Sequence, residues 1–266
     1  MIRWGLLFGS LAACSYSPSA GPADNPATID GMGDAAGDAE GTIDGVADTN
    51  NGCSNPITFV SSNNAVAGSG NTITVPSPSG VMQDDVLIAA VVFQADSDEQ
   101  PGTLSTPTAW TLVRQEAFGS NGGIGLATFT RTAIAAEPGT HAFVTSGGSK
   151  RFVVNILAYR DVDTANPIAD AQSQSAASST SIVAPSLSAP GCSMLVAAFA
   201  IRQATTIEPP VSMAEREDVN HTNGASITLA ASDEFFVSAA GTGTRVGLSA
   251  AAANQTIGQL IALRPQ

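Results

Sequence analysis

The chain has 266 residues, with 10 Lys and Arg against 23 Asp and Glu, and its formal net charge at pH 7 is −13. Phosphate binding depends on clustered basic charge, yet the sequence carries no Lys or Arg between Arg3 and Arg114. The composition therefore argues against nucleic acid as a partner, and against direct docking of a folded domain on anionic lipid.

The start of the chain has the layout of an export leader. Arg3 supplies a positive charge, and residues 4–13 form a short apolar segment that ends in small residues. A segment of about ten residues is too short for a membrane-spanning helix, which needs roughly 20. The string LAAC at 11–14 resembles the lipobox of bacterial lipoproteins. The resemblance implies that residues 1–13 are a signal peptide and that the Cys14 thiol is acylated; the alternative is an ordinary secretory signal with a bystander thiol.

The same resemblance implies a location. One acyl chain binds a membrane only marginally, at about 0.8 kcal/mol per buried methylene, whereas the several chains of the lipoprotein family, palmitate among them, anchor stably. The neutral residue Ser15 after the cysteine resembles the outer-membrane default of that family. We therefore expect an outer-membrane lipoprotein that faces the periplasm or the cell surface.

The cysteine count agrees with export. Lipidation of Cys14 would leave Cys53 and Cys192. An even pair in an oxidising compartment predicts one disulfide, with two unpaired buried thiols as the alternative, because geometry cannot be read from sequence. Closing so long a loop would stabilise the fold by up to about 4–5 kcal/mol in the entropic model.

Residues 14–55 are expected to form a disordered, acidic linker. They contain no aromatic residue after Tyr16, and their charged residues are all acidic. Such a segment cannot bury enough apolar surface to offset its ordering entropy, and like charges keep it extended. The repeated string TIDG at 28–31 and 42–45 lacks the alternating oxygen ligands of a calcium loop, which favours a spacer.

Residues 56–266 are predicted to form an all-β domain, a jelly-roll-like antiparallel β-sandwich. Short apolar or alternating runs are separated by Gly, Pro, Asn and Ser, a pattern typical of sandwiches and barrels. In chain order the expected strands are Ile57–Val60, Thr72–Val75, Val86–Phe93, Trp110–Glu116, Ile124–Ala133, His141–Thr145, Phe152–Tyr159, Ser181–Leu187, Met194–Ile201, Met213–Asp218, Ser226–Ala231, Arg245–Ser249 and Ile257–Leu263.

The strands fall into two series that resemble each other. The matching segments are 86–90 with 194–198, 124–127 with 227–230, 139–141 with 243–245, and 155–160 with 259–264. A nearly constant offset in one strand order indicates internal duplication, with pseudo-repeats at about 84–163 and 192–266. The halves could form two small sandwiches or interlock as one jelly roll. Because no linker-like sequence separates them, the single interlocked domain is favoured.

Three strings also resemble a β-sandwich module of uncharacterised bacterial surface proteins and some phage tail-associated proteins. They are PTAWTLV at 107–113, AEPG at 136–139, and AYRDVD at 158–163 with NPI at 166–168. The resemblance covers about residues 57–265 and implies a fold, without any single activity. Asp161 stands where that pattern more often has glycine, which points to a different local turn.

No catalytic constellation rises above background. The two histidines, His141 and His221, are expected on the surface, and no G-x-S-x-G elbow accompanies them. Two separated histidines without a cysteine pair argue against a zinc site. Trp110 and Tyr159 lie on apolar strands and are expected in the core, which weakens the case for a sugar-binding face.

Loop carboxylates are the remaining candidates for a site. Asp96, Asp98 and Glu99 share one loop, and Asp161 and Asp163 follow a strand, so that either group could bind calcium through oxygen ligands. Solvated loop acids are the favoured interpretation of both groups.

These features together predict a surface-tethered, non-enzymatic module with an interaction or structural role in the envelope. An envelope protein or a glycan is the candidate ligand for the interaction role, and a purely structural domain without a specific ligand is a further alternative. The rival prediction is a calcium-assisted protein that binds or cleaves glycans on a jelly roll.

Overall fold

The described part of the protein is built from β-strands. The computed structural model describes residues 52–95, 100–146, 151–222, 226–253 and 255–266. None of these residues is helical, and accordingly no membrane-spanning helix occurs within these ranges. The expected leader, Cys14 and nearly all of the linker lie outside the described residues.

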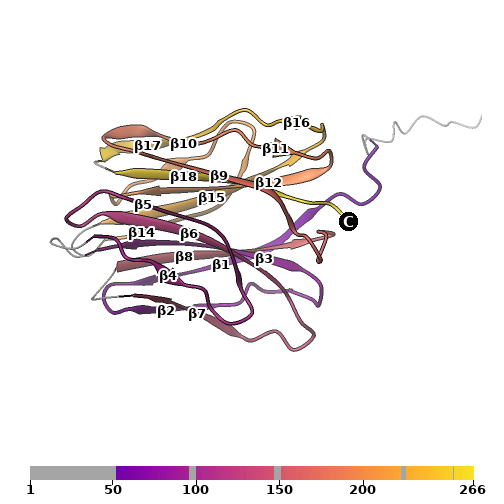
Figure 1. The fold of residues 1–266 in the computed structure, drawn as a ribbon, viewed down its shortest axis with the longest axis horizontal. Helices are drawn as coiled ribbons and strands as arrows, with labels where there is room; N and C mark the ends of the chain where they lie inside the picture. Colours follow the sequence, from indigo (N-terminus) through magenta and orange to yellow (C-terminus); the bar gives the residue numbers. More distant parts are fainter. Residues whose placement is uncertain (1–51, 96–99, 147–150, 223–225, 254) are drawn as a thin grey trace, which may run out of the picture. The chain divides into compact units, whose positions relative to one another are not determined.

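Eighteen strands are described, and they form two repeats (Figure 1). Repeat 1 holds β1 (Thr58–Ala67), β2 (Thr72–Pro76), β3 (Val86–Gln94), β4 (Leu104–Ser105), β5 (Thr111–Phe118), β6 (Ile124–Thr132), β7 (Thr140–Thr145) and β8 (Arg151–Arg160). Repeat 2 holds β9 (Ile168–Ala176), β10 (Ser179–Ala184), β11 (Ser188–Ala189), β12 (Ser193–Ile201), β13 (Ile207–Glu208), β14 (Ala214–His221), β15 (Ile227–Phe236), β16 (Ala240–Gly241), β17 (Arg245–Ala253) and β18 (Thr256–Leu263).

The two repeats have the same sheet topology. Repeat 1 has a large sheet of order β1-β8-β3-β6-β5 and a small sheet of order β2-β7-β4. Repeat 2 has a large sheet of order β9-β18-β12-β15-β14 and a small sheet of order β10-β17-β13, with β11 and β16 paired separately. All these pairs are antiparallel. The winding is that of a jelly roll, in which two Greek keys fill two sheets.

The expected all-β, jelly-roll-like fold with duplicated halves is confirmed, and the duplication is more complete than the sequence predicted. Each repeat begins before the expected boundary, since β1 and β2 precede residue 84 and β9 and β10 precede residue 192. Among the described strands, none joins a sheet of the other repeat. The halves are therefore two sandwiches, and the interlocked arrangement favoured from sequence is corrected.

Four layers follow from how the strands of the large sheets alternate. In β3, Leu87 and Ala89 pack toward the small sheet of repeat 1, whereas Val86 and Ile88 belong to a cluster that also contains residues of repeat 2. In β12, Leu195 packs in the same way toward the small sheet of repeat 2. The large sheets thus lie face to face between the two small sheets (Figure 1). Burial on both faces explains the continuous apolar runs of these strands.

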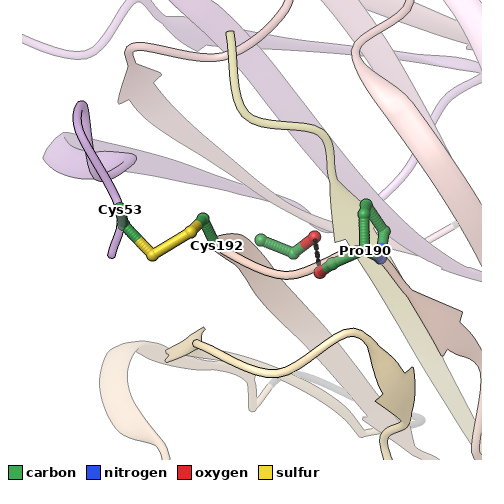
Figure 2. The surroundings of a disulfide bond; sticks show 4 residues. Cys53, Pro190 and Cys192 are labelled. Atoms are coloured by element: carbon green, nitrogen blue, oxygen red, sulfur yellow. Dashed lines mark hydrogen bonds between the residues drawn. A yellow bond between two sulfur atoms is a disulfide. The ribbon is translucent and has the colours of Figure 1, made fainter. Parts of the chain in front are cut away.

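A disulfide joins the two repeats (Figure 2). It links Cys53, just before β1, to Cys192, just before β12, with the Cα atoms 5.7 Å apart and a sequence separation of 139 residues. In the Cys192 loop, the Ser193 hydroxyl donates to the Pro190 carbonyl at 2.8 Å. The bridge uses the pair that remains when Cys14 is assigned to lipid.

Candidate functional site

A shallow groove lies where β9 meets the β11–β16 pair. Its volume is about 480 Å³, a size suited to a small ligand, and it is lined in part by Asp170, Ser188 and Arg264. The Asp170 carboxylate accepts hydrogen bonds from the Ser188 amide at 3.0 Å and the Ala171 amide at 2.8 Å. Arg264 donates from Nε to the Asn166 carbonyl at 3.2 Å. The groove presents charge of both signs, and each charged group also holds local backbone.

Ser77, His141 and Glu137 form a cluster whose composition resembles a hydrolytic triad. The His141 Nε2 atom lies 2.9 Å from the Ser77 hydroxyl oxygen and 3.5 Å from a Glu137 carboxylate oxygen. A triad needs the acid on one ring nitrogen and the nucleophile on the other, whereas here both lie at Nε2. The Ser77 hydroxyl donates to the Pro138 carbonyl, so that its oxygen accepts from His141. The arrangement closes a turn and is not set up for attack on a substrate.

Both histidines are buried, which corrects the expected surface position. His141 and His221 are 5% and 4% exposed. His141 lies on the inward face of β7, where the Trp110 ring meets its ring edge to face at 5.1 Å. Burial lowers the pKa of each imidazole below its usual value. Trp110 and Tyr159 are buried as expected.

The turn between β6 and β7 is organised by Glu137. Its carboxylate pairs with Arg131, with Nε to Oε1 at 2.7 Å and Nη2 to Oε2 at 3.1 Å. It also accepts the Ile134 amide at 3.0 Å. Glu137 is thus saturated by partners of its own repeat.

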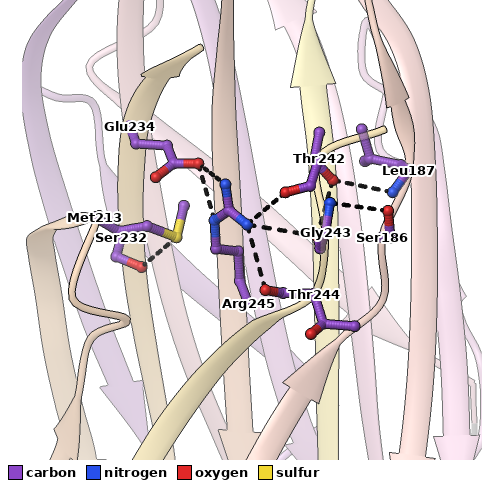
Figure 3. A network of polar contacts seen from close by, with 9 residues as sticks. All are labelled: Ser186, Leu187, Met213, Ser232, Glu234, Thr242, Gly243, Thr244 and Arg245. Atoms are coloured by element: carbon purple, nitrogen blue, oxygen red, sulfur yellow. Dashed lines mark hydrogen bonds and ion pairs between the residues drawn. The ribbon is translucent and has the colours of Figure 1, made fainter. Parts of the chain in front are cut away.

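Repeat 2 carries an ion pair at the equivalent place (Figure 3). Arg245 donates from Nε to the Glu234 carboxylate at 2.8 Å and from Nη1 to the Thr242 carbonyl at 2.6 Å. The Gly243 amide donates to the Ser186 hydroxyl at 3.0 Å, and the Leu187 amide donates to the Thr242 hydroxyl at 3.1 Å. The network in Figure 3 therefore joins the end of β15 to the loops that flank β11 and β16.

A third polar cluster connects the two repeats. The Tyr159 hydroxyl donates to the Asp233 carboxylate at 3.0 Å, and Arg216 donates from Nε to the same carboxylate at 2.9 Å. The Arg216 guanidinium lies 4.1 Å from the centre of the Phe59 ring. Burial, followed by the charge of Asp233, raises the pKa of Tyr159. Because Tyr159 and Asp233 are almost fully buried, we assign this cluster to repeat packing.

The structure places two of the five predicted calcium ligands. The Asp163 carboxylate accepts the amides of Ala165 and Asn166 at 2.9 and 3.1 Å, which caps the turn after β8. Asp161 has a φ of 66°, the left-handed conformation that glycine adopts without strain. It therefore keeps the backbone geometry of the glycine that the related pattern more often has.

The other predicted ligands, Asp96, Asp98 and Glu99, lie outside the described residues. Within the described ranges, no group of three or more His, Cys, Asp or Glu side chains is placed to hold a metal ion. Calcium binding therefore stays a prediction.

Sequence reasoning missed the groove beside β9. Its walls come from β11 and β16, which have only two residues each and leave no periodic pattern. Asp170 and Arg264 are far apart in sequence, so neither residue signals the other.

The comparisons with known proteins show no family for this chain. No family model matches the chain, and no curated protein matches it. A solved structure titled "Crystal Structure of the STIV MCP" aligns with 79% of this chain and 96% of that chain, at 6% identity and a TM-score of 0.21. A likeness this low carries no weight for fold or function.

Proposed function

We propose that this protein is a lipid-anchored, non-enzymatic module of the bacterial envelope, in which a double β-sandwich serves as an interaction or structural unit. The observation that carries the proposal is the closure of the polar clusters. The Ser77–His141–Glu137 group holds a turn, and the Tyr159–Asp233–Arg216 group joins two repeats. Each of these groups is occupied by partners inside the fold, as in a structural role.

The leader and the lipobox-like string support the anchor. Acylation at Cys14 would attach the chain to a membrane, and residues 14–55 would separate the anchor from β1. A flexible segment of that length has a root-mean-square span of roughly 30–40 Å. The sandwich would then stand clear of the lipid surface, with its loops and the groove beside β9 available to an envelope protein or a glycan.

The rival function, calcium-assisted binding or cleavage of glycans, has no observation in its favour within the described residues. Asp163 caps a turn, and Asp161 serves the same turn through its backbone conformation.

Membrane fractionation of the wild-type protein and of Cys14→Ser tests the anchor. We expect the wild type in the membrane fraction with an acylated Cys14 at its mature N-terminus, and the variant in the soluble fraction. Ser15→Ala is the matched control, because it keeps the cysteine and a small neutral residue after it. A wild-type N-terminus with an unmodified Cys14 would contradict the anchor.

The soluble Cys14→Ser protein also tests the binding role. It is to be screened against glycans, peptidoglycan and envelope proteins, with and without calcium. We expect a ligand that is bound and left chemically unchanged. Release of a cleaved product would overturn the non-enzymatic proposal, and the absence of any ligand would leave only the structural part of it.

A further inference from the structure

The face between the two large sheets is self-complementary. Asn155 of β8 donates to the Leu229 carbonyl of β15 at 3.4 Å. Gln259 of β18 donates to the Leu126 carbonyl of β6 at 3.1 Å. Because β18 corresponds to β8 and β15 to β6, these are one contact made in both directions, the signature of a two-fold, isologous interface.

The edges of the large sheets repeat this symmetry. β1 lies against β14, and their counterparts β9 and β5 lie against each other in the same way. The Asn64 side-chain amide donates to Glu217 at 2.9 Å on one side, and the Ser175 hydroxyl donates to Glu116 at 3.0 Å on the other. The two large sheets therefore present nearly the same surface to each other.

Two covalent connections hold the repeats in one pair. The first is the main chain at 161–167, which an extended backbone could stretch to about 23 Å. An isolated antiparallel β-bridge between Val162 and Pro265 holds this segment against the C-terminus. The hydrogen bond from the Gln266 amide to the Asp161 carbonyl at 3.3 Å does the same. The second connection is the Cys53–Cys192 disulfide, which leads directly from repeat 1 to repeat 2.

We propose that the large-sheet face is an exchangeable self-association surface, and that the Cys53–Cys192 disulfide locks it onto the other repeat of the same chain. When this disulfide is reduced, repeat 1 of one chain pairs with repeat 2 of a second copy, and the segment 161–167 is the hinge. This inference does not depend on the lipid anchor or on any ligand of the envelope module.

Opening the lock is a two-electron reduction. A dithiol reductant supplies two electrons and two protons, the S–S bond breaks, Cys53 and Cys192 become thiols, and the reductant closes to its own disulfide. The reverse reaction on an exchanged pair, with a small disulfide as oxidant, forms the same bond between two chains and releases two molecules of the corresponding thiol.

Two single variants give a sharp test in the full-length Cys14→Ser protein. Cys53→Ser retains only Cys192 in the fold, and Cys192→Ser retains only Cys53, so neither chain can form the bridge alone. The two are mixed in equal amounts with one isotope-labelled, partly unfolded in denaturant, refolded at high protein concentration and oxidised with oxidised glutathione. Cross-linked peptides are then identified by mass spectrometry.

We expect covalent dimers in the mixture, almost all joined by Cys53 of one chain and Cys192 of the other. Random collision of thiols would instead give 53–53, 53–192 and 192–192 links in a ratio of about 1:2:1. That ratio, or a protein that stays monomeric by light scattering at every concentration, would overturn the proposal.

The control separates loss of the lock from loss of stability. Cys14→Ser with its disulfide intact is treated in the same way, alone and combined with Leu195→Ala, which weakens the core of repeat 2 without touching the bridge. Both should remain monomeric. Equal dimer formation by the Leu195→Ala protein would show that destabilisation alone opens the face and would contradict a locking role.

Discussion

The two repeats solve the same packing problem with different side chains. In repeat 1, the Gln115 side-chain oxygen accepts the Leu104 amide of β4 at 3.2 Å. In repeat 2, Asp218 accepts the Ile207 amide of β13 at 3.0 Å from the corresponding strand. Both bonds satisfy the backbone amide of a two-residue strand. The hydrogen bond is therefore present in both repeats, although the residue that accepts it differs.

Charged residues differ between the repeats in a related way. The sheet registers place Glu234 where repeat 1 has Arg131, and Arg245 where repeat 1 has His141. Each sandwich keeps an ion pair near its end, but the β6 position that carries the positive charge in repeat 1 carries the negative charge on β15 in repeat 2. Topology in this protein is therefore set by apolar alternation and register, and polar pairs are exchangeable provided that they are complete.

Bulky side chains also change places between the repeats. Phe143 on β7 has Gly247 as its counterpart on β17, whereas Val91 on β3 has Phe199 as its counterpart on β12. A side-chain carbon built on Gly247 would lie 3.0 Å from the Phe199 ring. At this pair of positions the aromatic ring comes from the small sheet in repeat 1 and from the large sheet in repeat 2.

The largest effect is expected from emptying the core of repeat 1. Phe143 is fully buried and packs on Phe129 and Trp110, with ring centres 5.5 Å apart in both pairs. Phe143→Ala should lower the free energy of unfolding by about 3–5 kcal/mol, measured by denaturant titration. A loss below 1 kcal/mol would mean that the site collapses without a cavity.

The exchange of bulky side chains is tested by placing the residue types of repeat 1 at the equivalent positions of repeat 2. Gly247→Phe should overpack the core and cost about 1–3 kcal/mol, while Phe199→Val leaves a hollow and costs roughly 2–4 kcal/mol. In the double variant the losses should fall short of their sum by about 1–3 kcal/mol. Simple additivity in this double-mutant cycle would contradict the proposed exchange.

Each repeat carries one buried histidine whose lowered pKa should make the fold sensitive to acid, His141 in repeat 1 and His221 in repeat 2. Burial lowers the folded-state pKa of His141, so its stabilising contribution is present above the unfolded value of 6.5 and is lost as pH falls below it. His141→Gln should flatten the loss of stability between about pH 7.5 and 5.5. Denaturation midpoints across that range give the comparison, and parallel curves for wild type and variant would argue against His141 as the source.

Asp218 in repeat 2 should contribute to the pH dependence with the opposite sign. Burial raises the folded-state pKa of its carboxyl above its usual value of 3.8, so the group favours the folded state at low pH and disfavours it as pH rises through the folded-state pKa. Asp218→Asn keeps the acceptor for the Ile207 amide and removes the charge. We expect a small gain in the denaturation midpoint at pH 7 and little change below pH 4; Gln115→Glu, the reverse exchange in repeat 1, should lose stability at pH 7.

The strands with strong apolar patterns could be predicted from the sequence. Every expected strand coincides with a described one, including β3 and β12, whose buried runs follow from burial on both faces. β9 was missed because Ile168–Ala176 is an edge strand rich in Ala, Ser and Gln, and its residues are only half-buried. The interlocked single roll was favoured because no linker-like sequence separates the halves, whereas in the structure the short segment 161–167 connects β8 to β9.

Site geometry was less predictable, because it depends on residues brought together by the loops. The sequence predicts His141 on the surface, but the alternation of β7 turns it inward beside Trp110. Asp161 and Asp163 were expected as ligands, and their turn shows them in backbone roles. The inward position of His141 follows from its sharing one face of β7 with Phe143, whereas the roles of Asp161 and Asp163 depend on a turn geometry that residue spacing does not show.

The chain enters and leaves its described fold at one place. Gly52 and Cys53 line the same 130 Å³ pocket as Pro265 and Gln266. Neighbouring ends make a fold a good subject for circular permutation. A short linker from Gln266 to Gly52 would allow new chain ends to be placed in surface turns. A fluorescent reporter could then be attached at different positions around the sandwich, while each strand keeps its neighbours in the sheets.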